Sequence, residues 1–223
     1  MLYAAMRFVV APLARLVYRP IVEGRGNVPK HGGVIIASNH LSFIDSVVIP
    51  IVAPRPVVFI AKKEYWEGTG ISGSLTRAWF NAIGSIPVER GTFGAAQASL
   101  DAALTILKDG QAFGIYPEGT RSRDGRLYRG KTGVGWLALT AQVPVVPCAV
   151  IGTDKLQPVG TRLPRLKRVT VRFGEPLTFS PPGSGTTAAQ ARREATDQVM
   201  AVIASMSPQE HAGIYNESPH PTP

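Results

Sequence analysis

The chain has 223 residues, of which 44% are apolar, and its formal net charge is +9. This length and apolar content are typical of one globular domain with a substantial core, and they exclude an intrinsically disordered chain. The single cysteine, Cys148, excludes an intrachain disulfide, and its apolar neighbours predict a buried, inert thiol. The positive charge favours an anionic partner. We expect no nucleic acid, because the sequence lacks a zinc-finger spacing, a basic zipper and a ribonucleoprotein signature.

The first twenty residues predict an amphipathic helix that lies on a membrane. Arg7 and Arg15 interrupt their apolar sequence, whereas a helix that spans a bilayer needs about 20 consecutive apolar residues. On a helical wheel the arginines gather in one sector and leave a wide apolar face, which is typical of interfacial membrane helices. A helix that packs on its own domain is the alternative. We therefore divide the chain into this helix at 1–20, one domain at 21–207 and a flexible tail at 208–223.

The domain alternates apolar strands with helices. Short apolar runs bounded by turn residues predict strands, and longer stretches with helical periodicity predict helices. The predicted strands cover 34–37, 57–61, 84–90, 112–116, 145–150 and 169–173, and the predicted helices cover 42–52, 94–109 and 187–206. This alternation predicts a single α/β domain. The densest basic cluster, from Arg162 to Arg172, is either a solvated face or, near a bilayer, a contact for anionic lipid.

A histidine and an aspartate stand between a predicted strand and a predicted helix, in the stretch Asn39-His40-Leu41-Ser42-Phe43-Ile44-Asp45. Positions five apart on one helix point about 140° apart, so His40 must precede the helix for the two side chains to meet. Ser42 and Asp45 fit a capping box, which predicts that the helix begins at Ser42 and carries Asp45 in its first turn. The carboxylate can then orient the imidazole, as in hydrolytic triads, and His40 becomes a candidate general base. The alternative is a helix cap beside a surface histidine.

Two further polar turns follow strand ends, where α/β sheets hold their ligands. Arg90 closes the strand of 84–90, and Pro117-Glu118-Gly119-Thr120-Arg121-Ser122 follows the strand of 112–116. Backbone N–H groups in a glycine turn, with an arginine beside them, suit a phosphate group. The second turn is therefore a candidate phosphate site.

Four stretches follow one another in the chain: Asn39-His40 with Asp45; Gly84, Ile86 and Arg90; Tyr116-Pro117-Glu118-Gly119-Thr120-Arg121-Ser122; and Val143-Pro144-Val145-Val146-Pro147. In order and spacing they resemble the four sequence blocks of the lysophosphatidic acid acyltransferase (1-acyl-sn-glycerol-3-phosphate acyltransferase) family of glycerolipid acyltransferases. The third block departs from the family pattern only by a tyrosine in place of phenylalanine. The resemblance implies a glycerol-3-phosphate acyltransferase-like fold, in which helices flank a mixed, mostly parallel sheet, and it makes 21–207 the acyltransferase domain.

The resemblance also implies roles for individual residues. His40 is the expected catalytic base and Asp45 its orienting acid, with Asn39 and Ser42 in support. The predicted phosphate-binding set for the acceptor is Arg90, Glu118, Gly119, Thr120, Arg121 and Lys131. Within it, Arg90 and Arg121 are expected to grip the phosphate, and Glu118 and Gly119 to shape the loop. No metal ion or other cofactor is implied, because the acyl thioester of CoA or of acyl carrier protein is itself a co-substrate.

The implied reaction transfers a fatty acyl group from that thioester to the free hydroxyl of 1-acyl-glycerol-3-phosphate (lysophosphatidic acid) and gives phosphatidic acid. Glycerol 3-phosphate or another lysolipid or polyol is the alternative acceptor. Direct attack needs no acyl-enzyme, and the sequence contains no Gly-x-Ser-x-Gly nucleophile elbow. We expect a peripheral or monotopic protein on the anionic cytoplasmic face of the cell membrane. The rival classes are a non-catalytic lipid-binding protein and a nucleic-acid binder.

Overall fold

The computed structural model describes residues 11–82, 85–88, 94–161 and 163–217, and the statements below concern those residues. Its centre is a seven-stranded sheet in the order β1-β8-β7-β2-β5-β3-β4. The strands are β1 (Ile21–Glu23), β2 (Val34–Ser38), β3 (Val57–Lys62), β4 (Ile86–Val88), β5 (Ala112–Ile115), β7 (Val145–Ile151) and β8 (Thr170–Phe173). Neighbouring strands run parallel except for β7 and β8. The strands β2, β3, β4 and β5 therefore end at the same edge of the sheet.

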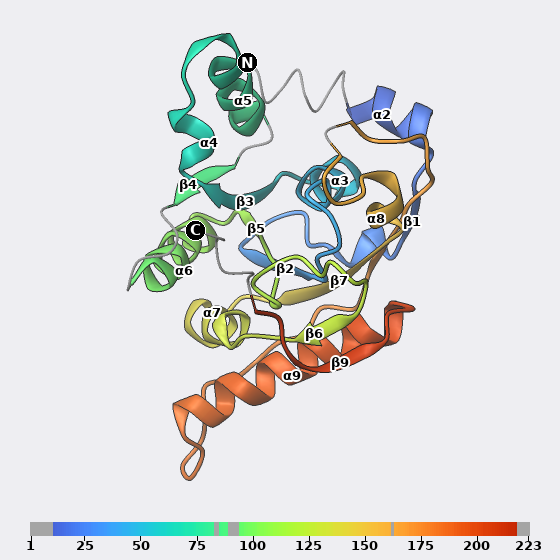
Figure 1. The fold of residues 1–223 in the computed structure, drawn as a ribbon. Helices are drawn as coiled ribbons and strands as arrows, with labels where there is room; N and C mark the ends of the chain where they lie inside the picture. Colours follow the sequence, from blue (N-terminus) through green and yellow to red (C-terminus); the bar gives the residue numbers. More distant parts are fainter. Residues whose placement is uncertain (1–10, 83–84, 89–93, 162, 218–223) are drawn as a thin grey trace.

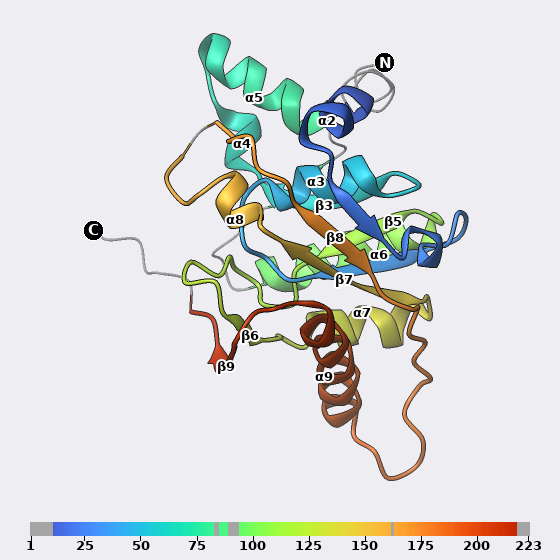
Figure 2. The same ribbon diagram turned by 90° about the vertical axis from the view of Figure 1, so that its right-hand side faces the viewer.

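Helices cover both faces of this sheet (Figures 1 and 2). They are α2 (Ala11–Tyr18), α3 (Asp45–Val52), α4 (Glu64–Glu67), α5 (Gly70–Ala82), α6 (Ala95–Lys108), α7 (Gly133–Ala141), α8 (Thr153–Leu156) and α9 (Ala188–Met206), with a 3-10 turn η2 (Arg25–Asn27). Alternate residues of β2 enter two separate cores. Val34 and Ile36 pack with α3, whereas Ile35 and Ala37 pack with α6, α7 and α9. A strand buried on both faces needs apolar residues throughout, which explains its continuous apolar run.

The predicted single α/β domain with a mostly parallel sheet is confirmed, and most predicted elements agree closely with the observed ones. The last helix begins as its sequence predicts, because Thr187 is its N-cap residue. The hydroxyl oxygen of Thr187 accepts a hydrogen bond of 3.2 Å from Gln190 N. This bond satisfies one of the N–H groups that every helix leaves unpaired in its first turn.

The segment after α9 differs from the flexible tail that we expected over 208–223. There β9 (His211–Tyr215) pairs in parallel with β6 (Leu127–Arg129) and forms a second, two-stranded sheet. Leu127 N also donates to Glu210 O at 2.8 Å. The pairing partner lies far earlier in the chain, so the composition near the chain's end carries no signal of it. Residues 218–223 lie outside the described residues.

Only part of the predicted membrane helix lies in the described residues, which begin at Ala11. α2 packs on the domain through the buried Ala11 and through Arg15, whose guanidinium donates to the carbonyl oxygen of Ile51 in α3. Three large apolar side chains of α2 are more than half exposed: Leu13, Leu16 and Val17. This helix therefore turns an arginine towards the domain and apolar side chains away from it. Within the described ranges, the helices are all too short or too polar to cross a membrane.

Candidate active site

The catalytic candidates leave the sheet where β2 ends. Asn39 follows β2 and is fully buried, and its side-chain amide bonds to both backbone groups of Val150 in β7. Nδ2 donates to Val150 O at 2.9 Å, and Oδ1 accepts from Val150 N at 2.7 Å. The side chain thus replaces the next pair of ladder hydrogen bonds. The backbone at His40 can then turn out of the sheet without leaving a buried strand group unpaired.

The structure brings His40 and Asp45 together. Nδ1 of His40 lies 2.8 Å from Oδ2 of Asp45, whose side chain is fully buried. The same oxygen accepts hydrogen bonds of 2.8 Å from the N–H groups of Leu41 and Ser42. Because the carboxylate accepts the hydrogen bond of Nδ1–H, Nε2 is the ring nitrogen that can accept a proton. The turn therefore holds the imidazole in the tautomer that a general base needs.

The predicted role of Ser42 as the helix cap is wrong. α3 begins at Asp45, and its N-cap residue is Ile44, which has no polar side chain. The half of the capping box in which Asp45 accepts from Ser42 N–H is present, but the serine hydroxyl donates to Gln157 O at 2.7 Å. Because Ser42 is only 2% exposed, its hydroxyl needs an acceptor inside the protein. That acceptor lies in the segment after α8, which no local sequence pattern contains.

A stack of three rings supports the imidazole. The ring of His40 lies on that of Tyr116, with centroids 3.8 Å apart, and Tyr116 stacks in turn on Phe59 at 5.2 Å. Gly114 makes room for the stack, since a Cβ atom there would lie 2.2 Å from the Phe59 ring. The Tyr116 hydroxyl lies 2.8 Å from Ser46 Oγ, and burial raises its pKa well above the usual value, so the phenol stays neutral. Sequence reasoning missed this role, although the tyrosine in the third block marked the position.

Glu118 is turned towards His40 and away from solvent, in a position to shape the loop as the resemblance implies. It is fully buried, and its two carboxylate oxygens accept from His40 N and Tyr128 N, each at 3.0 Å. In the reverse direction, Ser122 N donates to His40 O at 2.8 Å. Both backbone groups of His40 are thus bonded to the third block. Burial raises the pKa of Glu118 to about 7, although its two backbone hydrogen bonds act in the opposite direction.

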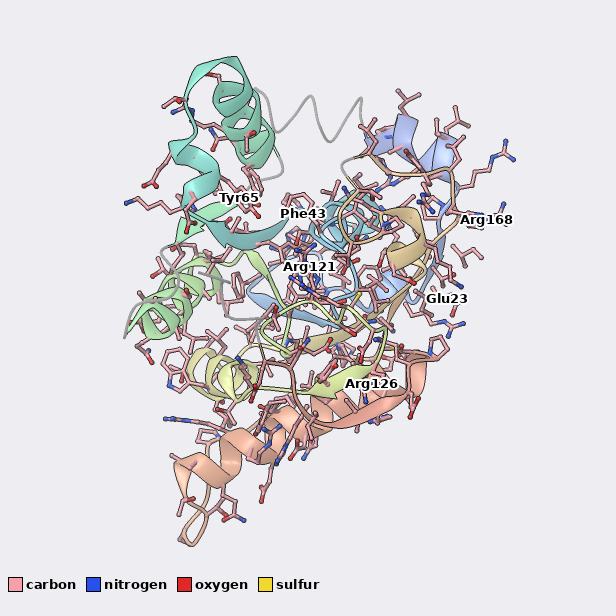
Figure 3. The ribbon with its side chains drawn as sticks, in the orientation of Figure 1. Glu23, Phe43, Tyr65, Arg121, Arg126 and Arg168 are labelled. Atoms are coloured by element: carbon pink, nitrogen blue, oxygen red, sulfur yellow. The ribbon has the colours of Figure 1, made fainter. Side chains whose placement is uncertain are left out.

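The described part of the predicted phosphate set contains two cations. The side chain of Lys131 packs against Gly119, because a Cβ atom built on this glycine would lie 3.2 Å from the lysine Nζ. Gly119 has a φ of +79°, which favours glycine, and its N–H donates to a carbonyl of the same turn at 2.9 Å. Thr120 and Arg121 on this loop are partly buried, whereas Arg90 lies outside the described residues. Figure 3 labels Arg121. An anion here would therefore be held by cationic side chains more than by the glycine N–H that we expected.

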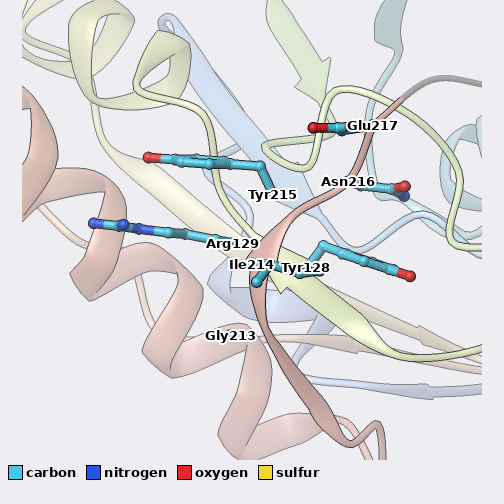
Figure 4. A pocket seen from close by; sticks show the side chains of 7 residues that line it. All are labelled: Tyr128, Arg129, Gly213, Ile214, Tyr215, Asn216 and Glu217. Carbon is cyan, nitrogen blue, oxygen red and sulfur yellow. The ribbon is translucent and has the colours of Figure 1, made fainter.

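The segment 207–217, which follows α9, contacts this loop and the residues around it, a role that sequence reasoning missed. Gln209 accepts from Asn39 Nδ2 at 2.6 Å and donates to Gly125 O at 2.9 Å. Asn216 Nδ2 donates to Arg121 O at 3.1 Å. Asn216 also lines a pocket of about 680 Å³, together with residues of the paired strands β6 and β9 (Figure 4). No local signal marks these contacts, because each depends on segments that are distant in sequence.

Within the described ranges, neither catalysis by a cysteine nucleophile nor catalysis by a bound metal ion has structural support. Cys148 is fully buried in β7, and burial raises the pKa of its thiol to about 12, so it stays protonated as predicted. Across the described residues, no three His, Cys, Asp or Glu side chains gather in the way that a metal site requires. The arrangement is suited to proton removal by His40 from a hydroxyl whose molecule also carries an anionic group.

Comparisons with known proteins point to one family. The family model described as Acyltransferase matches residues 19–151. The chain is 32% identical over 146 residues to a chloroplastic 1-acyl-sn-glycerol-3-phosphate acyltransferase of Brassica napus, which covers 65% of this chain and 40% of the relative. It is 30% identical over 158 residues to a 1-acyl-sn-glycerol-3-phosphate acyltransferase of Bacillus subtilis, which covers 70% of this chain and 72% of the relative. The chain thus spans less than half the length of the plant relative.

The likeness extends to a solved structure. The crystal structure of the 1-acyl-sn-glycerophosphate (LPA) acyltransferase PlsC from Thermotoga maritima aligns with a TM-score of 0.63 and 25% sequence identity. The alignment covers 93% of this chain and 81% of that chain. The shared fold therefore includes segments on both sides of the residues that the family model matches.

Proposed function

This chain belongs to the acyltransferase family, and on that premise we propose that it is an O-acyltransferase. The proposed reaction moves a fatty acyl group from the thioester of CoA or acyl carrier protein to the free hydroxyl of 1-acyl-glycerol-3-phosphate, and it yields phosphatidic acid. The names of the relatives support this acceptor. The observation that carries the proposal is the hydrogen-bonded pair of His40 and Asp45, which is joined through the His40 backbone to the loop of Arg121.

Nε2 of His40 is the proposed base. It accepts the proton of the acceptor hydroxyl while the oxygen of that hydroxyl attacks the thioester carbonyl carbon. The carbon–sulfur bond then breaks, the ester forms, and the leaving thiolate takes the proton back from the imidazolium. Asp45 stabilises the imidazolium, because its buried Oδ2 lies 2.8 Å from Nδ1. The acyl group thus ends on the acceptor oxygen and the proton on the leaving thiol, and the proposed step needs no acyl-enzyme, metal ion or further cofactor.

Arg121, Lys131 and Arg90 are the proposed partners of the acceptor's phosphate. An arginine can bind phosphate through two parallel N–H bonds, and a lysine adds a point charge. The proposed role of Glu118 is different, since its carboxylate accepts from the backbone N–H of His40. In that position it keeps the base at a set distance from the loop that binds the phosphate.

The acceptor is a lipid, so we propose that the protein works as a peripheral or monotopic protein at the cytoplasmic face of the cell membrane. The net charge of +9 supports contact with an anionic surface. The exposed apolar side chains of α2 support partial insertion of that helix between lipid headgroups.

Thiol release from acyl-CoA, measured with and without an acceptor, tests the proposed function. Wild-type protein should release thiol only when lysophosphatidic acid is present. The variant His40→Ala should release almost none, with or without this acceptor. A panel of lysophosphatidic acid, glycerol 3-phosphate and other lysophospholipids then ranks the acceptors with one acyl-CoA. Absence of turnover with every acceptor would favour a non-catalytic lipid-binding protein. Fastest turnover of glycerol 3-phosphate would overturn the proposed acceptor.

A further inference from the structure

Exposed large apolar side chains are concentrated on two elements. Among the described residues, those more than half exposed are Leu13, Leu16 and Val17 on α2, Val159, Leu163 and Leu166 on the loop 157–168, and Ile214 on β9. The loop leucines are the extreme cases, with exposed fractions of 81% for Leu163 and 75% for Leu166. Single exposed apolar residues are ordinary, but a cluster of them marks an interaction surface.

The helix and the loop lie side by side. Ile21 N, just after α2, donates to Val169 O, just after the loop, at 2.9 Å. Figures 1 and 2 both show the orange loop passing beside the blue α2. We call the surface that the exposed side chains of α2 and of the loop form the α2–loop face.

The α2–loop face is also positively charged. Arg165, Lys167 and Arg168 stand next to the loop leucines and are exposed. Neither 11–20 nor 157–168 contains an aspartate or a glutamate. A second copy of the chain would bring the same positive charges to such an interface and so repel. An anionic bilayer takes both kinds of side chain, with the leucines below the headgroups and the cations among them.

We propose that the loop 157–168 makes a second contact with the anionic bilayer beside α2, and that it couples this contact to the catalytic turn. The loop begins at Gln157, whose carbonyl oxygen accepts the hydroxyl of Ser42 at 2.7 Å. Ser42 N in turn donates to the carboxylate that orients His40. Docking of the loop therefore holds the base near headgroup level, where the hydroxyl of a lipid acceptor lies. This inference rests on the proposed function for the identity of that acceptor.

Cosedimentation of the full chain with vesicles tests the surface. The double variant Leu163→Ser with Leu166→Ser should bind vesicles of phosphatidylcholine and phosphatidylglycerol at least tenfold more weakly than wild type, since two apolar side chains lose their burial. Ile214→Ser is the matched control, because Ile214 is 60% exposed but lies on β9. It should bind as wild type does.

Two single lysine substitutions, one on the loop and one far from it, test the electrostatic part of the contact independently of the leucines. Lys167→Gln should weaken binding about fivefold at low salt and less at high salt. Lys30→Gln is its control, since Lys30 is exposed before β2 begins and thus at the opposite edge of the sheet from His40. Wild-type vesicle binding by both the leucine double variant and Lys167→Gln would overturn the proposal. If the double leucine variant changes the oligomeric state of the protein in solution but not its vesicle binding, the face would instead belong to an interface with a second copy.

Turnover separates this inference from the proposed function. The double leucine variant should lose turnover of lysophosphatidic acid embedded in anionic vesicles but keep turnover of a short-chain acceptor that is monomeric in solution. If wild type turns over neither acceptor, the proposed function fails whatever the vesicle binding. If the variant loses both activities equally while its thermal unfolding is unchanged, the loop serves the chemistry and not the membrane.

Discussion

Replacing Glu118 by glutamine separates a direct contact with the acceptor's phosphate from the support of the His40 backbone that its contacts indicate. The buried carboxylate accepts one N–H from His40 and one from Tyr128, each at 3.0 Å. Glutamine keeps the shape but offers one oxygen and one NH₂ group, so one of these N–H groups loses its acceptor. The backbone that carries the base then shifts, and a misplacement of about 1 Å costs about 100-fold in rate. We therefore expect Glu118→Gln to lower kcat about 100-fold and to change the KM for the acceptor little.

The stability of this variant depends on two opposing effects. A buried N–H without an acceptor costs about 1–3 kcal/mol. Against this, burial raises the pKa of Glu118 from 4.5 to about 7, so ionising it in the folded protein costs about 3 kcal/mol. Because the folded pKa lies above the unfolded one, the stability that this group contributes is complete below pH 4.5 and is lost as the pH rises through about 7. Glutamine does not ionise and escapes that loss.

Urea unfolding at a series of pH values, together with steady-state kinetics above pH 7, measures both quantities. Between pH 4.5 and pH 8, the free energy of unfolding of wild type should fall by about 3 kcal/mol more than that of Glu118→Gln. Glu194→Gln, at an exposed position of α9, is the matched control and should keep wild-type kinetics. A higher acceptor KM with unchanged kcat would refute the reasoning, because it would place Glu118 among the direct contacts of the phosphate.

Three further perturbations test other parts of the site. Asp45→Asn should lower kcat about 100- to 10,000-fold in steady-state assays, because asparagine can still accept from the turn's N–H groups but cannot stabilise an imidazolium; near-normal turnover would leave Asp45 a purely structural residue. Arg121→Lys should raise the KM for lysophosphatidic acid about tenfold, since lysine loses the two-pronged contact with phosphate. An equal rise in the KM for acyl-CoA would instead show that Arg121 holds the loop together. Deleting residues 1–20 should leave a folded protein by circular dichroism that sediments poorly with anionic vesicles and loses more activity on bilayer-embedded acceptors than on soluble ones. Unfolding of the truncated protein would assign α2 to the core.

The parts of the site that are local in sequence could be predicted. His40 and Asp45 lie five residues apart at a strand–helix junction, so their spacing alone restricts how they meet. Strand β2 was predictable as well, because burial on both faces demands a continuous apolar run. The four ordered blocks identified the family, and the comparisons confirm that resemblance.

The remaining contacts join segments that the sequence keeps apart. Glu118 stands in a loop with the composition of a phosphate site, yet its carboxylate is buried against backbone donors. Ser42 fits a helix cap, yet its hydroxyl bonds to Gln157. Gln209 lies in a stretch with the composition of a tail, yet it bonds to Asn39 next to the base. In each case a buried polar group needs a partner, and packing decides which one it finds.

The central claim is that His40 removes the proton from the acceptor hydroxyl, and the kcat of His40→Ala tests it most directly. The assay uses acyl-CoA and lysophosphatidic acid at saturating concentrations, with circular dichroism of the same sample to show that the fold is intact. Loss of a general base should lower kcat about 100- to 10,000-fold. A folded His40→Ala protein that keeps more than about a tenth of the wild-type kcat would contradict the claim, because so small a loss is below what a general base contributes.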